Sequence, residues 1–472
     1  MMGNFTKVGK RRNEMRTITL LTVLSSVLLS SAHARDERSV LRAEVDGIPW
    51  FYHVKDGGAV LKGVDPCEVN LKKDHRRNVL IPAMVDVFPV RELTEDVFVM
   101  SPYWNNETCL TVEVLTLPES LRKIDFRAIK AFRNLARIEV DVRNPVYESE
   151  GGGLYIRQDK ELFLVPPIPS EVFRIRPGTM CVFPAAFRYA DKIESLVIPS
   201  SMEGDFPALS HCRALKAITV EIGNKTYYSQ NGTVMRRDGV LVACPKAIET
   251  YDVDNRIVGI GPYCFSGCAQ MKELTIPESV TNISEGAFSG CRRLLSVRLP
   301  DGVASIGGFS FRGCLGLRKI ALPKNLSMIG THLFGDCTNL SSISIPREVK
   351  VIADNAFWRC SSLSFVEVPQ SVTNIGYSAF WGCTSVEEFH ISSNECYMDW
   401  GVFAGCASLK RIVFEGKVPK RRRRIFEHTP DGLKIVVKKD SREWALFLDQ
   451  EGFKPRGRFA SGQEMTYDRK GW

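Results

Sequence analysis

The sequence predicts a mainly β solenoid with short helical turns, built from 23-residue repeats with β-hairpin insertions and terminal caps. Two columns of residues that repeat without a slip carry this prediction. The cysteine column is Cys268, Cys291, Cys314, Cys337, Cys360, Cys383 and Cys406. The phenylalanine column, three residues ahead, is Phe265, Phe288, Phe311, Phe334, Phe357, Phe380 and Phe403. Such a fixed period indicates one supersecondary unit stacked many times.

Each unit contains one short strand. A third column follows each cysteine by three residues: Met271, Leu294, Leu317, Leu340, Leu363, Val386 and Leu409. Leu294-x-x-Val297-x-Leu299 is the strand pattern of leucine-rich repeats. Alternation points Val297 and Leu299 inward and leaves Arg298 outside, and the proline that follows ends the strand. We therefore expect parallel strands about 4.8 Å apart over a continuous core.

Two coils are longer than the others, and their additional residues carry matching patterns. The first insertion contains Asn144-Pro-Val-Tyr147 and the second Asn224-Lys-Thr-Tyr227. In both, a glycine and alternating apolar residues follow. Each insertion therefore predicts a β-hairpin let into a coil.

Units such as Ala287-Phe288-Ser-Gly-Cys291-x-x-Leu294, with strands ending in Ile-Pro, resemble the BspA-type leucine-rich-repeat family. The Asn-x-x-Tyr hairpins are similar to that family too, and the resemblance covers roughly residues 80–437. It implies a secreted or surface-attached bacterial protein that binds and adheres and does not catalyse. It supplies no ligand residues, because the motif itself forms the core. The early coils depart from the pattern at Ile129, Phe132, Ala190, Leu209 and Cys212.

The ends of the chain predict three further segments around a solenoid of residues 91–437. Residues 1–34 read as a signal peptide with a basic start, an apolar run of 12 residues and a small-x-small cleavage site; a membrane anchor is the alternative. Residues 35–90 predict an N-terminal β cap with strands on both sides of Asp56-Gly57-Gly58, and Trp50 as a lid over the first coil. Residues 438–472 predict a C-terminal cap with an amphipathic helix at 444–448, and a polar tail from Gly457 that frays.

No second apolar run of 18 or more residues follows the leader, so we expect no transmembrane segment in the mature chain. The predicted localisation is secreted, extracellular or at the cell surface, with the periplasm as the alternative. The chain carries a formal net charge of +9, of which the leader holds a large part. The basic run 420–424 follows an export signal, so nucleic acid is not the expected partner. The basic run is expected to be either a solvated turn or a patch that binds an anionic polysaccharide, a lipid headgroup or an acidic partner.

The cysteine column predicts buried free thiols, because a small, apolar side chain suits a core position and parallel side chains oppose the torsion that a disulfide needs. Disulfides in an exported protein are expected first at the positions outside the column: Cys67, Cys109, Cys181, Cys244 and Cys396. No column of histidine or carboxylate accompanies the cysteines, which argues against a metal site. Catalytic motifs are absent from the sequence, so we expect no enzyme and no cofactor.

Outward positions of the strands provide one candidate binding surface. Its named candidates are Arg298, Lys319, Phe365, Glu367 and His390, and Val413 stands in the same outward column. Phe365 is the aromatic anchor candidate on an otherwise polar face. For His390, a solvated histidine is the alternative to a functional one.

A second candidate surface is aromatic. Positions beside the Phe column are small, polar or charged in earlier coils but become Trp358, Tyr377, Trp381 and Trp400 near the C-terminus. We expect these four side chains to form one patch. Either the C-terminal tail, through Trp444 and Phe447, covers the patch, or it is exposed and binds a partner or a sugar.

These observations predict a secreted or surface-associated protein that mediates protein–protein binding or adhesion through its solenoid surface. The expected partner is a host, matrix or neighbouring-cell surface protein, with polysaccharide as another option. Two alternatives stay open: a structural envelope or self-assembling component, and a carbohydrate-binding accessory protein.

Overall fold

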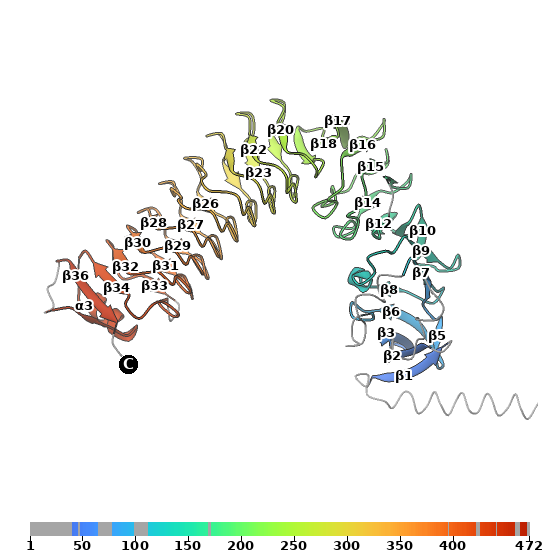
Figure 1. Cartoon of the computed structure of the whole chain (residues 1–472), viewed down its shortest axis with the longest axis horizontal. Coiled ribbons are helices and arrows are strands. Elements are labelled where there is room, and N and C mark those ends of the chain that lie inside the picture. The colour runs from blue at the N-terminus through green and yellow to red at the C-terminus, as the bar shows by residue number, and fades with distance from the viewer. Residues whose placement is uncertain are drawn as a thin grey trace, which may run out of the picture. The chain divides into compact units, whose positions relative to one another are not determined.

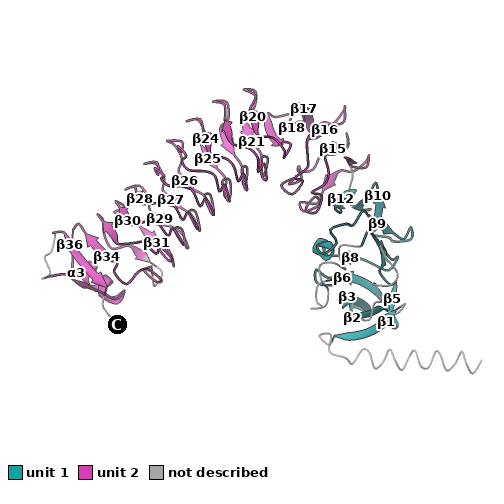
Figure 2. Cartoon of the chain, viewed as in Figure 1, with its two compact units in different colours: residues 1–168 teal, residues 169–472 magenta. Residues whose placement is uncertain are grey.

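The computed structural model describes residues 40–45, 48–64, 78–98, 112–168, 171–394, 396–421, 425–439, 441–457 and 463–469. The chain divides into two compact units, residues 1–168 and 169–472 (Figure 2). The predicted signal peptide, Cys67, Cys109 and the core of the basic run at 422–424 lie outside the described residues. The division into signal peptide, cap, solenoid and tail stays a prediction.

Unit 1 begins with an antiparallel sheet of β1 (Leu41–Val45), β2 (Ile48–Lys55) and β3 (Gly58–Val64) (Figure 1). Asp56 and Gly57 join β2 to β3 with left-handed φ values of 49° and 70°, as the predicted glycine turn requires. Trp50 on β2 is only 1% exposed, which excludes it as a surface residue. On the other side, β3 pairs in parallel with β6 (Phe88–Leu93), which pairs with β8 (Lys123–Ile124) and, antiparallel, with β5 (Met84–Val85).

The coils of unit 1 are already stacked in parallel. Strands β4 (Asn78–Leu80), β7 (Val114–Leu117) and β9 (Arg137–Val140) form a parallel ladder. The turn of the middle coil is a 3₁₀ helix, η1 (Phe126–Ile129), which begins after Asp125 because the carboxylate accepts a hydrogen bond from the amide of Arg127.

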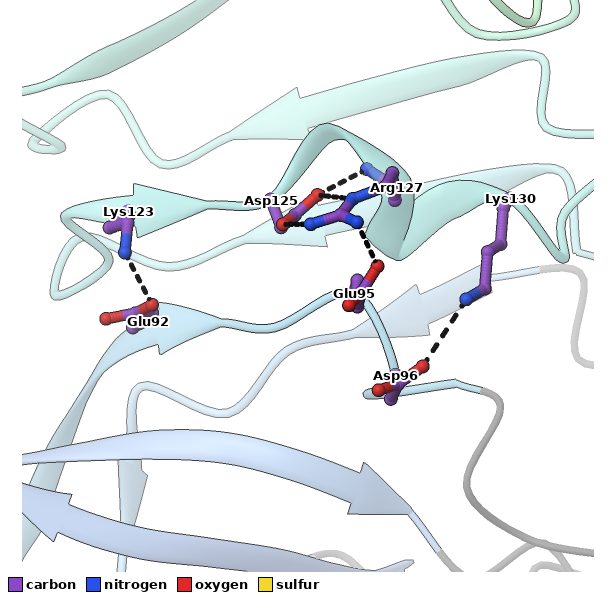
Figure 3. Close-up of polar contacts among 7 residues, drawn as sticks. All are labelled: Glu92, Glu95, Asp96, Lys123, Asp125, Arg127 and Lys130. Atoms are coloured by element: carbon purple, nitrogen blue, oxygen red, sulfur yellow. Dashed lines mark hydrogen bonds and ion pairs between the residues drawn. The ribbon is translucent and has the colours of Figure 1, made fainter. Parts of the chain in front are cut away.

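Ion pairs link neighbouring coils on the surface of unit 1 (Figure 3). The pairs between coils are Lys123–Glu92 at 2.8 Å, Arg127–Glu95 at 2.5 Å and Lys130–Asp96 at 3.4 Å. Arg127 also binds Asp125 and, with its backbone amide, holds the pKa of that carboxyl below its usual range. The basic side chains of these pairs are 37 to 68% exposed, so we expect each ion pair to add little to the stability of unit 1.

The two insertions are confirmed as β-hairpins, each extended by a third antiparallel strand. The first is β10 (Tyr147–Glu150), β11 (Gly153–Ile156) and β12 (Glu161–Leu164); the second is β17 (Tyr227–Gln230), β18 (Thr233–Arg236) and β19 (Val240–Ala243). Asn144 and Asn224 are both 1% exposed. Each donates its amide to two carbonyls of the preceding coil and accepts two backbone amides at its oxygen. Buried amides must be satisfied, which accounts for the matching patterns.

Unit 2 stacks its coils around two rows of parallel strands, each row divided into separate hydrogen-bonded sheets (Figure 1). We call the first the front sheet: β13 (Val172–Arg174), β15 (Ser195–Ile198), β16 (Ala217–Val220), β20 (Thr250–Asp252), β22 (Glu273–Thr275), β24 (Ser296–Arg298), β28 (Phe365–Val368), β30 (Glu388–Ile391), β32 (Arg411–Phe414) and β34 (Lys434–Val437). The back sheet consists of two-residue strands: β14 (Cys181–Val182), β21 (Gly259–Ile260), β23 (Asn282–Ile283), β25 (Ser305–Ile306), β26 (Met328–Ile329), β27 (Val351–Ile352), β29 (Asn374–Ile375), β31 (Tyr397–Met398) and β33 (Lys420–Arg421). The third side of each coil is a turn that carries the Phe and Cys columns.

The predicted core columns are confirmed. Every residue of the Phe and Cys columns is 0% exposed. From Phe265 to Phe380 successive rings stack at centroid distances between 5.1 and 5.7 Å. From Cys291 to Cys406, each thiol donates to the carbonyl of the column Phe in the preceding coil at 3.0 to 3.3 Å. The cysteine thus fills a small apolar site and also satisfies a buried carbonyl.

One expectation of the stack is wrong: the front sheet is not continuous. Residues 318–323 and 341–346 form no strand between β24 and β28. Ile320 and Ile345 stay buried there at 4% and 7% exposure, and the turns remain hydrogen-bonded, for example from Phe311 N to Leu333 O at 3.0 Å. Packing therefore holds these coils, and lysine and alanine at 319 and 321 are among the residues that strands disfavour.

The C-terminus is more ordered than the sequence predicts. Helix α3 (Arg442–Gln450) confirms the amphipathic segment and buries Trp444, Phe447 and Leu448. The expectation that the chain frays from Gly457 is wrong for residues 463–469. There β36 (Met465–Arg469) pairs antiparallel with β34 and with β35 (Phe453–Pro455). Only Met465 and Tyr467 of β36 point inward, so the sequence of this segment resembles that of a polar tail.

Candidate binding site

The turn side of each coil separates buried from exposed positions. The chain passes through two left-handed residues, one two positions before the column Phe and one two positions after it. Around Phe357 these are Asn355 (φ 55°) and Arg359 (φ 58°), and around Phe380 they are Ser378 (φ 49°) and Gly382 (φ 71°). The Phe between them points into the core together with the alanine before it, while the residue after it, Trp358 or Trp381, is half-buried.

The four predicted aromatic residues gather there as two stacked pairs, which we call the aromatic cluster. The rings of Trp358 and Trp381 lie 5.5 Å apart at an interplanar angle of 18°. The rings of Tyr377 and Trp400 lie 5.4 Å apart, also at 18°. Tyr377 is 44% exposed and the three tryptophans are half-buried. Among the described residues no ring contact joins the two pairs, so the cluster is two parallel strips and not one continuous patch.

Charged neighbours fix the cluster in place. The Arg359 guanidinium lies 5.2 Å from the centre of the Trp358 ring, a cation–π geometry. The indole N–H of Trp400 donates to Glu427 at 2.8 Å. The amide of Tyr377 donates to the Asp354 carboxylate, also at 2.8 Å. These contacts order the rings before any ligand arrives, which lowers the entropic cost of binding.

The C-terminal residues expected to cover the cluster pack elsewhere. Trp444 lies against Phe414, with ring centroids 5.0 Å apart, and donates its indole N–H to Gly416 O at 3.2 Å. Phe447 packs against Trp444 and Phe426. Both residues therefore close the last coil, and neither side chain covers the aromatic cluster.

Two further residues extend the Trp358–Trp381 strip, and the sequence analysis missed them. His332 meets Trp358 edge to face at 6.1 Å, and Phe309 stacks on His332 at 5.0 Å. Both occupy the left-handed position, at φ 50° and 61°, which is rare for large side chains. Burial, together with the positive charge of Arg312, lowers the pKa of His332 and so favours the neutral ring. Inspection of the column two residues before the Phe would have found them.

On the front sheet, the structure brings two of the candidates together. Phe365 is 44% exposed, and its ring meets that of His390 edge to face at 5.3 Å. The Nε2 atom of His390 lies 2.7 Å from the Glu388 carboxylate, which Arg411 also approaches at 3.5 Å. His390 is therefore part of a small charged network rather than a freely solvated side chain.

The other front-sheet candidates are dispersed. Glu367 is exposed on β28 in register with His390. Arg298 is exposed on β24, and Lys319 is exposed in the stretch without strands. The sequence predicts that Val413 faces outward, but the structure contradicts this. Val413 is 1% exposed and lies between His390 and Val436 of the flanking strands.

The thiols offer no open chemistry at this surface. Burial raises the pKa of every column thiol, for Cys406 to about 12. Cys244 and Cys396, two of the positions outside the column where disulfides are expected, are buried free thiols in the structure. Among the described residues there is no group of three or more potential metal ligands, and no helix long and apolar enough to cross a bilayer.

One family model matches part of the chain. Six copies of the BspA type leucine rich repeat region match residues 243–364 and 305–434. No curated protein matches the sequence. Among solved structures, a leucine-rich repeat protein from Eubacterium ventriosum is 19% identical, with 72% of this chain and 94% of that chain covered and a TM-score of 0.44.

Two other solved structures are similar. A leucine-rich repeat protein from Bacteroides ovatus is 20% identical, covering 84% of this chain and 99% of its own, with a TM-score of 0.41. The pneumococcal vaccine antigen PcpA is 17% identical, with 88% of this chain and 97% of that chain covered and a TM-score of 0.35. The repeat segment 243–434 of this chain is a BspA-type leucine-rich-repeat region, as its motifs predict.

Proposed function

We propose that this protein is a secreted or surface-associated binding protein that recognises a protein partner through the aromatic cluster. The observation that carries the proposal is the gathering of Trp358, Trp381, Tyr377 and Trp400 on the accessible side of consecutive coils. Tryptophan, tyrosine and arginine dominate the binding energy of protein interfaces, and Arg359 adjoins the cluster. A rigid solenoid holds such a site in one conformation, so binding loses little conformational entropy.

A protein partner fits the cluster better than a sugar does. Sugar rings pack on open aromatic faces, but here each ring uses one face for its stacked partner. The partly exposed rings also lie next to the charges of Arg359 and Asp354. Apolar side chains and acidic groups of another protein match these features. No part of the proposal requires catalysis or a cofactor.

The test is quantitative capture of surface proteins from intact cells and matrix by the immobilised full chain. The Trp358→Ser/Trp381→Ser double variant is expected to lose at least tenfold in binding with its melting temperature little changed. Phe365→Ser, a change at a front-sheet ring that is 44% exposed, is the control and is expected to bind normally. Loss of binding in the control alone would move the site to the front sheet.

Two treatments separate the alternatives. Protease treatment of the target abolishes binding if the partner is a protein, whereas glycosidase treatment abolishes it if the partner is a polysaccharide. Recovery of only further copies of this chain would instead indicate a self-assembling component of an envelope. Binding that survives both tryptophan substitutions contradicts the proposed site.

A further inference from the structure

Cys268 opens the cysteine column, and its surroundings differ from those of the six that follow. Each later thiol donates to the carbonyl of a column Phe, but the coil before Cys268 has no such Phe. The thiol of Cys268 instead lies 3.4 Å from that of Cys244 and 3.5 Å from the carbonyl of Pro245. Both cysteines are 0% exposed.

The geometry that opposes disulfides within the column is absent from this pair. Column cysteines are 23 residues apart and their parallel side chains face the same way, which opposes the near-perpendicular torsion of a disulfide. Cys244 is 24 residues before Cys268 and follows β19, the last strand of the second insertion. Its side chain therefore approaches Cys268 from a different backbone position, and the two sulfur atoms already touch.

A buried cation lies among these thiols. Lys246 is 3% exposed and donates its ammonium to the carbonyl of Cys264 at 2.9 Å. Burial raises the pKa of the Cys244 and Cys268 thiols well above the usual range, and the Lys246 charge acts in the opposite direction. A nearby ammonium favours the thiolate, which is the reactive form in disulfide exchange.

We propose that Cys244 and Cys268 are a modification site: they form a disulfide, by exchange with a small-molecule disulfide, as these coils close during folding. The thiolate of Cys244 attacks one sulfur of that oxidant and releases one thiol. The thiolate of Cys268 then attacks the Cys244 sulfur of the mixed disulfide, forms the protein disulfide and releases the second thiol. Two protein thiols are oxidised, one small-molecule disulfide is reduced, and the two released thiols carry the two protons.

This disulfide joins the coil that carries the second insertion to the first coil of the regular repeats. It closes a loop of about 24 residues, which restricts the unfolded chain without altering the aromatic cluster. The remaining column thiols stay reduced, because their parallel side chains face the same way and oppose the torsion of a disulfide.

Refolding the reduced full chain with oxidised and reduced glutathione tests the proposal. After the free thiols are blocked under denaturing conditions, mass spectrometry of the peptides should find Cys244 linked to Cys268, with Cys314, Cys337 and Cys360 blocked. Recovery of both Cys244 and Cys268 as blocked free thiols would overturn it. This result is read from the wild-type chain and does not depend on a variant that folds.

Variants sharpen the test. Oxidation is expected to raise the urea midpoint of the wild type and of Cys314→Ala, a column control, but not that of Cys244→Ala. An equal gain in Cys244→Ala would assign the effect to another pair. Lys246→Met is expected to raise the pH at which thiol–disulfide exchange reaches half its maximal rate. An unchanged pH profile would show that Lys246 plays no part in the exchange, and the disulfide itself would then be judged from the peptide mass spectra alone.

Discussion

The same turn position carries a lysine in unit 1 and a tryptophan in unit 2. Lys130 follows Ile129, which is 1% exposed, and pairs with Asp96. Trp381 follows Phe380, which is 0% exposed, and stacks on Trp358. The inward residue is a large hydrophobe in both places, but the outward one changes from charge to aromatic ring. The comparison teaches that the core fixes the coil and leaves the neighbouring surface position free to acquire a binding role.

The two units also differ in how their cores are built. In unit 1, Phe132 occupies the place of the cysteine and packs on Phe98 at 4.6 Å. In unit 2, stacked Phe rings and thiols repeat in register from coil to coil. Stability in unit 2 should therefore respond sharply to any change that acts on the whole column at once.

The largest expected effect is alkaline unfolding that begins in unit 2. Burial holds the thiol of Cys406 protonated up to a pKa of about 12, whereas an unfolded thiol ionises near its ordinary value. Ionisation therefore favours the unfolded chain: the stabilisation is complete below about pH 8 and falls as the pH rises toward about 12, by about 1.4 kcal/mol per pH unit for each thiol. Urea midpoints between pH 7 and 10.5 measure the fall. Limited proteolysis that cuts unit 1 first at high pH would contradict this account.

The next largest effect is that of one column ring. Phe334 is stacked between Phe311 and Phe357 at 5.7 and 5.5 Å. Replacement by alanine opens a cavity and should cost about 3–5 kcal/mol in the free energy of unfolding. Phe365→Ala is the control, because its ring is 44% exposed and should cost far less. Urea unfolding compares the two, and equal midpoints would show that the column does not carry the stack.

The smallest effect is expected at the ion pairs of unit 1. Lys123 pairs with Glu92 at 2.8 Å, but its side chain is 68% exposed. Lys123→Ala should therefore change the free energy of unfolding by less than about 1 kcal/mol, and 1 M salt should remove even that difference. A loss as large as that of Phe334→Ala would mean that surface charge, not the core, holds the coils of unit 1 together.

The sequence predicts the periodic part of the molecule well because its signal is one-dimensional. The Phe and Cys columns, both insertions and the amphipathic helix follow from spacing alone. What spacing does not reveal are contacts that break the period. The polar sequence of β36 hides a strand with two inward residues, and Cys244 meets Cys268 across 24 residues rather than the 23 of the column.

The candidate site follows the same rule. The stacked pairs Trp358–Trp381 and Tyr377–Trp400 could be predicted, since each pair is 23 residues apart in one column. The roles of Trp444 and Phe447 could not, because the fold-back of a non-repeating segment depends on which end of the core it meets.

The central claim is that core and binding surface are separable within one turn, and adjacent residues test it directly. Trp358 and Trp381 lie at the surface next to Phe357 and Phe380, whose rings stack in the core at 5.1 Å. The measurement is the melting temperature of Trp358→Ser/Trp381→Ser beside that of Phe357→Ala/Phe380→Ala. The account predicts a small decrease for the tryptophan pair and a large decrease, or failure to fold, for the phenylalanine pair. A decrease of equal size in both would show that the tryptophans are part of the core and would contradict the claim.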